Sequence, residues 1–378
     1  MHADEGASSL RRCNLRTVSE KSVLILLPDQ GGIQYHARGT ATGARELKVS
    51  VADIEVESSI SLVGILRIAR LASAMLKSRE VLYAEIGRNE GTTFLVALLA
   101  SWLSGKSINV LSHDGALLVR SPGAFILKRS TRNSKRIAYR VLSPVLSGLI
   151  RSLFIRQVAR WYVTSEAARD SMLAAGLTPC FVMTHGLEDP ISTISPSEAR
   201  AIVVPGILGS NKGTDIAVDA WIQLNITEDY FLHIIGNTHE GSRPWTRQLH
   251  QRLIDSGKNF QWTVDSASDR EFQLAIANSA IVLVPYRESN PASGVVVRAV
   301  VEGRCIIGTT VPAVLSEVED GKSGIVISTA EPSVLATAIN HLVNNPQLRD
   351  QFGARLVELR GQGRRWSDQF ESIAKEWR

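Results

Sequence analysis

The sequence predicts an α/β protein built from two doubly wound halves, and three observations carry that prediction. The chain has 378 residues, which exceeds the roughly 100 to 200 residues of one ordinary domain. Short runs rich in β-branched residues alternate with helix-like stretches, as a parallel sheet with crossover helices requires. A stretch rich in Pro, Ser and Thr, residues 186–198, has the composition of a linker. We therefore expect one domain over 1–190 and a second over 191–355.

The first half begins with a strand at Ser22 to Leu27 (SVLILL), whose continuous apolar character is typical of a strand buried on both faces. A loop, Pro28 to Gly32, then leads into a helix. Further strands are expected at Val81 to Glu85, Ser107 to Leu111 and Trp161 to Thr164, with helices at Gly91 to Leu103 and Ser165 to Ala175. Strand and helix alternate throughout.

The second half repeats this pattern from Ala201 to Pro205 (AIVVP) onward. Its other expected strands are Tyr230 to Ile235, Phe260 to Val264, Ala280 to Pro285, Cys305 to Gly308 and Gly324 to Ile327. No short-period repeat interrupts the series, so solenoid and fibrous architectures are excluded.

Composition narrows the class of protein. Three cysteines without a C-x-x-C spacing indicate neither a disulfide framework nor a structural zinc site, which suits a reducing cytoplasm. We expect neither a signal peptide nor a membrane-spanning helix, since the apolar runs are shorter than about 20 residues. A net charge of +5 favours anionic partners such as nucleotide diphosphates or anionic lipid.

The segment Val204 to Asp215 (VPGILGSNKGTD) is a candidate phosphate loop. It leaves a strand, passes three glycines including Gly206, and enters a helix, so backbone N–H groups and the helix N-terminus could meet an anion beside Lys212. The spacing matches neither the P-loop nor the dinucleotide-binding fingerprint. A plain turn with a solvated lysine is the alternative.

A second segment carries a resemblance to a known family. Val284 to Thr309 (VPYRESNPASGVVVRAVVEGRCIIGT) contains a strand ending in Pro285 and Tyr286, then Ser293 and Gly294 at a helix start. With EVEDGKSG at 317–324, this order resembles the donor-binding half of GT-B glycosyltransferases of the large retaining family 4. The resemblance implies two Rossmann-like domains facing a central cleft, and a final helix over 356–378 that crosses back to the first domain.

The resemblance also implies a set of donor contacts in the second domain. Lys212, Ser293 and Gly294 would hold the diphosphate of a UDP- or GDP-linked sugar, with Gly206 in the same loop and Glu288 near the place of the family's first acidic residue. Two departures stand out. Arg298 occupies the place of the second acidic residue, which in the family accepts from ribose hydroxyls, and the first loop has no arginine beside Gly206.

The acceptor side is predicted in the first domain. Gly31, Gly32 and His36 resemble the family's glycine-rich loop with a histidine in the following helix, and His185 its His-Gly pair before the hinge. His113 and Asp114 follow a strand at the carboxyl edge where ligands of such sheets collect. Either residue could bond the sugar or the attacking hydroxyl, and Asp114 could act as a base; a helix-capping aspartate is the alternative.

Neither a metal nor a cofactor is expected beyond the nucleotide-sugar co-substrate. The sequence contains no D-x-D, and Lys212 with helix N-termini could take the metal's role.

Residues 115–165 contain ten Lys and Arg side chains and no acidic residue. Interspersed apolar residues could make basic amphipathic helices that lie on an anionic membrane, although a solvated face or an acceptor-phosphate groove has the same composition. Nucleic acid is not expected, because no aromatic stacking platform accompanies the charge.

The resemblance thus implies a retaining, metal-independent, hexosyl-type glycosyltransferase of polysaccharide or glycolipid biosynthesis, acting on a glycan or lipid-linked acceptor. It is expected in the cytoplasm or on the inner face of the cytoplasmic membrane. A catalytically silent GT-B binding or assembly subunit is the main alternative, and a two-domain nucleotide-sugar epimerase is the third.

Overall fold

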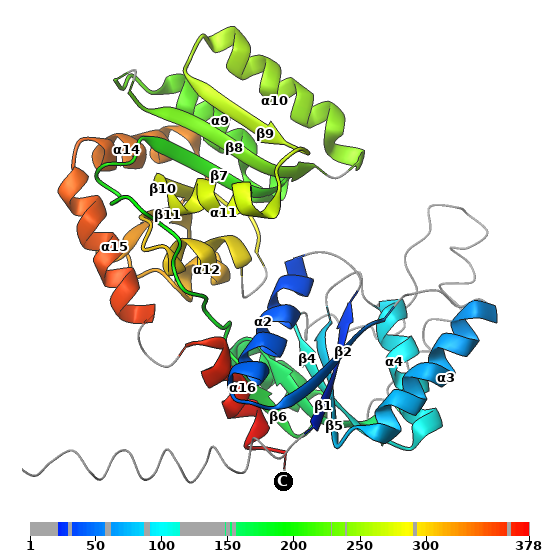
Figure 1. Cartoon of the computed structure of the whole chain (residues 1–378). Coiled ribbons are helices and arrows are strands. Elements are labelled where there is room, and N and C mark those ends of the chain that lie inside the picture. The colour runs from blue at the N-terminus through cyan, green and yellow to red at the C-terminus, as the bar shows by residue number, and fades with distance from the viewer. Residues whose placement is uncertain are drawn as a thin grey trace, which may run out of the picture. The chain divides into compact units, whose positions relative to one another are not determined.

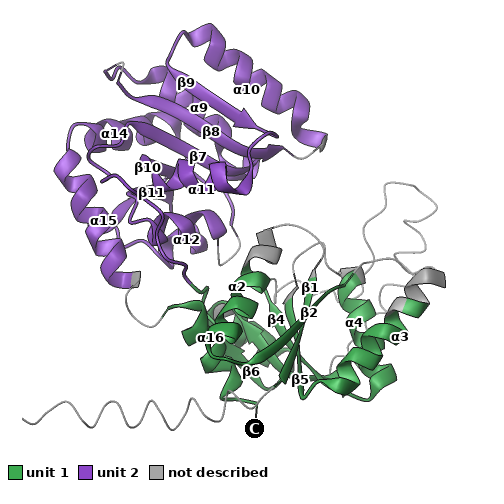
Figure 2. Cartoon of the chain, in the orientation of Figure 1, with its two compact units in different colours: residues 1–186, 364–378 green, residues 187–363 purple. Residues whose placement is uncertain are grey.

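A computed structural model gives the architecture of the protein (Figure 1). The structure describes residues 22–28, 32–56, 62–86, 91–113, 148, 152, 156–227, 229–238, 240–289, 293–360 and 364–377. The chain divides into two compact units (Figure 2): unit 1 is Met1–Gly186 with Arg364–Arg378, and unit 2 is Leu187–Gly363. The break falls after Gly186 rather than at residue 190.

Unit 1 is built on a parallel sheet in the order β2-β1-β3-β4-β5-β6. The strands are β1 (Ser22–Pro28), β2 (Ser50–Val56), β3 (Glu80–Ile86), β4 (Ile108–Ser112), β5 (Val158–Val163) and β6 (Cys180–Val182). The helices are α2 (Gly32–Glu46), α3 (Leu62–Lys77), α4 (Gly91–Ser104), α8 (Glu166–Ala174) and α16 (Trp366–Ala374).

Both faces of this sheet are covered, which explains the unbroken apolar run of β1. Leu24 and Leu26 point into the core shared with α3, α4 and α8. Val23, Ile25 and Leu27 point into the opposite core, shared with α2 and α16. Because alternate strand residues face opposite sides, a strand covered on both sides has to be apolar throughout.

Unit 2 repeats the plan with the strand order β12-β11-β10-β7-β8-β9. The strands are β7 (Ala201–Leu208), β8 (Phe231–Thr238), β9 (Phe260–Val264), β10 (Ser279–Val284), β11 (Ile306–Thr309) and β12 (Gly324–Ile327). The helices are α9 (Thr214–Gln223), α10 (Arg243–Ser256), α11 (Asp269–Ala277), α12 (Gly294–Val301), α13 (Pro312–Leu315), α14 (Pro332–Val343) and α15 (Pro346–Arg360), with short 3-10 turns η1 (Ser210–Lys212) and η2 (Glu240–Ser242).

The predicted bounds of the C-terminal helix, 356–378, are wrong. Residues from 356 to 360 belong to α15 of unit 2, so the helix that packs on unit 1 begins only at Trp366. That tryptophan sits against three glycines: a Cβ at Gly39, Gly43 or Gly186 would come within 2.2 to 2.3 Å of its atoms. Only glycine leaves room for the indole at positions 39 and 186 and for the Trp366 backbone at position 43, so these three positions determine how α16 packs.

The expected linker over 186–198 is also wrong for most of its length. Glu302 accepts from the backbone N–H groups of Ile191 (3.0 Å) and Ser192 (2.9 Å), and the buried Arg349 donates to the carbonyl of Pro196 (3.2 Å). A second buried arginine, Arg304, donates to Ile194. Residues 191–197 are therefore a fixed strap on unit 2, because each buried guanidinium needs these carbonyls as acceptors.

Candidate functional site

The first candidate loop is shaped by glycines at the end of β7. Gly206 has φ +121°, and a Cβ there would lie 3.3 Å from Val295 of α12. Gly213, which precedes α9, has φ +65°, and a Cβ there would lie 1.9 Å from the Pro285 carbonyl oxygen. Both glycines thus permit an approach that a side chain would block. The segments around Gly206, Pro285 and Ser293 converge within unit 2, as the sequence analysis expected of a donor site.

Lys212 and Ser293 meet through Tyr286. The Lys212 Nζ lies 4.0 Å from the centre of the Tyr286 ring, within the range of a cation–π contact. The Tyr286 hydroxyl shares a hydrogen bond with the Ser293 side chain, while burial raises the pKa of Tyr286 to about 12. One buried aromatic side chain therefore holds two predicted phosphate contacts near each other.

Burial also affects Lys212 itself. Desolvation lowers the pKa of Lys212 from its usual 10.5, because the partly buried ammonium has lost water. Burial alone lowers this pKa, and no carboxylate among the described residues forms an ion pair with Lys212. Lys212 shares a small pocket with Gly206, Thr214 and Tyr286. An anion placed there would supply the missing counter-charge.

The N-terminus of α12 supplies a second feature suited to an anion. Ser293 stands at the N-cap, but its side chain makes no capping hydrogen bond to the first turn. Backbone N–H groups at a helix start have no intrahelical partner and carry partial positive charge. Since the serine hydroxyl is engaged with Tyr286, the amides beginning at Gly294 are available to a ligand.

Sequence reasoning missed Arg287. Its guanidinium forms a two-pronged ion pair with Asp215 (2.9 and 2.8 Å) and also donates to the Ser210 carbonyl. Its backbone N–H donates to the Asn211 carbonyl at 2.9 Å. Arg287 thus ties the loop after β10 to the loop after β7. The signal was present in the pair Tyr286-Arg287 directly after a strand, but the acidic partner lies far away in sequence.

The structure also places Arg298, one of the two departures from the family pattern, and the predicted site residue Glu288. The Arg298 guanidinium lies 5.4 Å from the centre of the Phe272 ring of α11. Glu288 is exposed, and its backbone N–H donates to Asn211 at 3.3 Å. Neither observation places the Glu288 carboxylate with Lys212, so Glu288 stays an untested prediction.

Unit 1 brings three predicted histidines together. The ring of His36 is the centre of the group: the centres of the His113 and His185 rings lie 4.8 and 4.5 Å from it, both edge-on. Trp366 completes the group at 4.7 Å from His36. His36 and His185 are buried, whereas His113 is partly exposed and directly follows β4. We therefore distinguish His113, which is partly exposed, from the two buried histidines.

Some predicted residues lie outside the described part of the chain. These are Gly31, Asp114 and nearly all of the basic segment 115–165. Gly32 is the first residue of α2.

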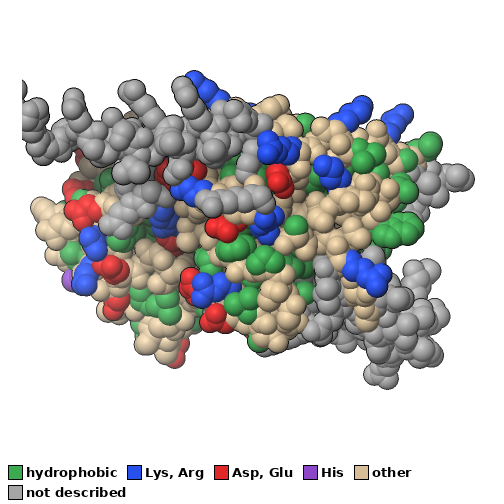
Figure 3. Space-filling model, turned by 90° about the horizontal axis from the view of Figure 1, so that it is seen from below, with side chains coloured by type: hydrophobic (Ala, Val, Ile, Leu, Met, Phe, Trp, Pro, Cys, Tyr) green, Lys and Arg blue, Asp and Glu red, His purple; other side chains and the backbone are tan. Residues whose placement is uncertain are grey.

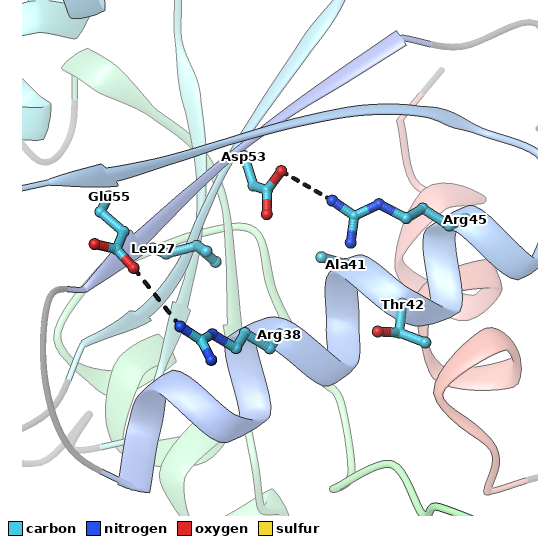
Figure 4. Close-up of a pocket in the computed structure, with 7 residues that line it drawn as sticks. All are labelled: Leu27, Arg38, Ala41, Thr42, Arg45, Asp53 and Glu55. Atoms are coloured by element: carbon cyan, nitrogen blue, oxygen red, sulfur yellow. Dashed lines mark hydrogen bonds and ion pairs between the residues drawn. The ribbon is translucent and has the colours of Figure 1, made fainter.

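A pocket of about 450 Å³ in unit 1 was not predicted from the sequence. Figure 4 shows Arg38 and Arg45 of α2 reaching toward Glu55 and Asp53 of β2. The Arg45–Asp53 pair is 2.8 Å long and the Arg38–Glu55 pair 3.7 Å. The four charges balance, so this pocket has no net attraction for an anion.

Within the described residues, no group of three or more His, Cys, Asp and Glu side chains is placed to hold a metal ion. None of the described helices is long and apolar enough to cross a membrane.

Comparison with solved structures identifies the fold. The chain resembles Anabaena Alr3699/HepE in complex with UDP and glucose, with a TM-score of 0.70 and 16% identity over 94% of this chain and 99% of that one. A glycosyltransferase from Rickettsia africae ESF-5 (TM-score 0.63, 14% identity, 94% and 97%) and sucrose-phosphate synthase from Thermosynechococcus elongatus (0.65, 12%, 94% and 98%) are also similar. No curated protein matches the sequence significantly.

The architecture of two six-stranded parallel sheets with covering helices is thus that of the GT-B glycosyltransferases, as predicted. Residues 199–345 match the family model described as glycosyl transferases group 1. The second unit therefore carries a group 1 glycosyltransferase domain, and the resemblance seen in its sequence is confirmed. The comparisons do not support a catalytically silent subunit.

Proposed function

We propose that the protein transfers a sugar from a UDP-linked donor to a glycan or lipid-linked acceptor, with retention of anomeric configuration and without a metal ion. The observation that carries this proposal is the arrangement of Lys212, Tyr286 and Ser293 at the uncapped N-terminus of α12. A diphosphate needs at least one cation and several N–H donors, and this arrangement offers both.

Donor binding follows from the electrostatics of the loop. Burial destabilises the charged form of Lys212 in the free protein, as its lowered pKa indicates. A diphosphate beside it would offset that cost, and the α12 amides would bind the remaining phosphate oxygens. In this proposal Lys212 and the helix stabilise the leaving diphosphate, which is the task a metal performs in other transferases. UDP is favoured because the Anabaena HepE structures contain UDP or UDP-glucose.

On the acceptor side we assign the direct role to His113. It is the partly exposed member of the histidine group and stands at the carboxyl end of β4, where ligands of open α/β sheets bind. Its imidazole would hydrogen-bond the transferred sugar or the attacking hydroxyl. His36 and His185 would hold the ring in place, and Asp114 remains the candidate base. We also propose that the part of the basic segment 115–165 that precedes β5 contacts an anionic membrane that carries the acceptor, because β5 itself lies in the sheet.

A thermal-shift screen against UDP, GDP, ADP and their sugar conjugates, with EDTA and then with Mg²⁺, tests donor binding. We expect UDP to raise the melting temperature in EDTA. In Lys212→Ala the UDP affinity should fall by about 1.5 to 3 kcal/mol, the strength of a charge-assisted hydrogen bond. Lys322→Ala, which removes an exposed lysine of the same unit, is the matched control and should bind UDP normally.

Product analysis then separates the alternatives. Sugar transfer with the donor's anomeric configuration supports the proposal, donor isomerisation would indicate an epimerase, and an inverted product would contradict retention. Absence of a shift with every nucleotide would leave the silent binding subunit as the better description.

A further inference from the structure

Four large apolar side chains of α3 and α4 are exposed on unit 1. Leu66 and Leu76 of α3 are 66% and 60% exposed, and Trp102 and Leu103 of α4 are 63% and 57% exposed. Within the part of unit 1 that the structure describes, the only other exposed large apolar side chain is Leu173 of α8, at 41%. Isolated apolar residues on a surface are ordinary, whereas a group on adjoining helices indicates a surface that binds something.

The two helices place these residues on one surface. α3 and α4 pack side by side over the same face of the sheet (Figure 1). Their C-terminal ends are joined: the Ser104 hydroxyl lies 3.7 Å from the Met75 sulfur, and Lys106 Nζ donates to the Ser78 carbonyl at 3.1 Å. Leu76, Trp102 and Leu103 therefore belong to the same end of the helix pair.

The charged residues of these two helices have one sign. Neither helix contains an Asp or Glu, while Arg70, Lys77 and Arg79 are exposed on α3 and directly after it. Arg70 and Lys77 follow Leu66 at helical spacing, four and eleven residues on, so they share its face. The next acidic residue, Glu80, accepts from Asn109. Figure 3 shows hydrophobic side chains with Lys and Arg around them on the side of unit 1 where α3 and α4 lie.

We propose that the C-terminal ends of α3 and α4 dock on the surface of an anionic lipid bilayer. We name this surface the α3–α4 patch, made of Leu76, Trp102 and Leu103 with Lys77 and Arg79. Tryptophan prefers the level of lipid headgroups, and leucine can enter the outer acyl region. Lys and Arg beside them gain from the negative potential of anionic lipid. An anionic bilayer therefore suits a surface that combines exposed apolar side chains with neighbouring Lys and Arg side chains.

This inference deepens the proposed function by placing a membrane-borne acceptor within reach, but it can be tested without donor or acceptor. Full-length protein is sedimented with vesicles of phosphatidylcholine alone and with vesicles that also contain about 30% phosphatidylglycerol. Each measurement is made at low and at high salt. We expect binding to the anionic vesicles that weakens with salt. The double variant Trp102→Ser/Leu103→Ser should lower the partition coefficient at least about tenfold. Lys77→Ser/Arg79→Ser should lower it on the order of 20-fold, on anionic vesicles only.

Leu173→Ser and Ile254→Ser are matched controls, since each removes an exposed apolar side chain elsewhere and should leave vesicle binding unchanged. UDP thermal shifts, measured on every variant, report folding and donor binding separately, so a failed donor site cannot imitate a failed membrane surface. The proposal is overturned if both α3–α4 variants bind vesicles like the wild type, or if only neutralising the basic segment 115–165 abolishes binding. It is also overturned if the apolar variant loses self-association in place of vesicle binding, because the patch would then join two copies of the chain.

Discussion

Replacing Gly213 with alanine tests the close approach between the two loops of the donor site. Gly213 and Gly257 both have φ +65°, so alanine pays the same left-handed backbone cost at each, roughly 1 to 2 kcal/mol. The surroundings differ. The new Cβ would lie 1.9 Å from the Pro285 carbonyl oxygen at position 213, and would meet nothing within 4 Å at position 257.

The Pro285 carbonyl cannot retreat freely. The residues after it are held by backbone hydrogen bonds, from Tyr286 to Val284 (2.8 Å) and from Arg287 to Asn211 (2.9 Å). Overpacking of this kind costs about 1 to 3 kcal/mol. We therefore expect Gly213→Ala to lower the free energy of unfolding by about 1 to 3 kcal/mol more than Gly257→Ala, and to weaken UDP binding as well.

Urea unfolding followed by circular dichroism measures both variants, and calorimetry with UDP follows the site. Equal destabilisation by the two substitutions would refute the reasoning, because it would mean that the loops do not approach as closely as the structure places them. A loss of stability without any loss of UDP affinity would separate the loop contact from donor binding.

Four further predictions concern buried or partly buried groups. At pH values between the lowered pKa of Lys212 in the folded protein and its usual 10.5, the unfolded chain binds more protons than the folded one, so Lys212 makes the free energy of unfolding rise with pH. Lys212→Met should remove that rise in urea titrations at several pH values. An unchanged slope would assign the rise to other groups. UDP affinity should fall as pH rises through the same lowered pKa, because the ammonium that holds the diphosphate is lost; a flat affinity profile would argue against Lys212 as a phosphate contact. Trp366→Ala should lower the free energy of unfolding by about 3 to 5 kcal/mol and Trp366→Phe by clearly less, since the indole is buried among glycines and histidines; thermal melts that show equal losses would contradict that packing. Arg349→Met should destabilise unit 2 by several kcal/mol, on the order of 3, because it removes the donor to the buried carbonyls of Leu342 and Val343 and to the Pro196 carbonyl of the strap; a near-neutral effect in urea unfolding would show that other contacts hold these groups.

Much of the fold was predictable because buried parallel strands have an unmistakable pattern. β9 and β12 have the predicted bounds, and β1 and β7 begin where predicted. β2 was missed for a physical reason. It is the edge strand of its sheet, with Asp53 and Glu55 exposed or half-exposed to reach the arginines of α2, so its sequence SVADIEV lacks the apolar run of a central strand.

The candidate site was predictable only where a local sequence pattern, such as glycines before a helix start, indicates how the backbone can bind a phosphate. Lys212 and Ser293 were found because glycines and a helix start mark a phosphate loop in sequence. Arg287 was not, since its partner Asp215 lies in the first turn of α9, 72 residues away in sequence, and pairs of that kind appear only after folding. The wrong prediction of a linker at the 191–197 strap has the same cause. Its Pro and Ser residues suit a linker, while Glu302, Arg304 and Arg349, which fix it, lie more than a hundred residues away.

At Lys212, the requirements of folding stability and of diphosphate binding oppose each other. An ammonium that is partly buried without a carboxylate costs the free protein stability, and the Tyr286 ring at 4.0 Å offsets only part of that cost, about 0.5 to 2 kcal/mol. A neighbouring aspartate in place of the ring would stabilise Lys212 more, yet it would repel the diphosphate. The aromatic partner holds the cation in position and leaves its charge uncancelled. Tyr286→Asp should therefore restore the ordinary pKa of Lys212 while abolishing UDP binding, whereas Tyr286→Phe should keep UDP binding and lose only the hydrogen bond to Ser293.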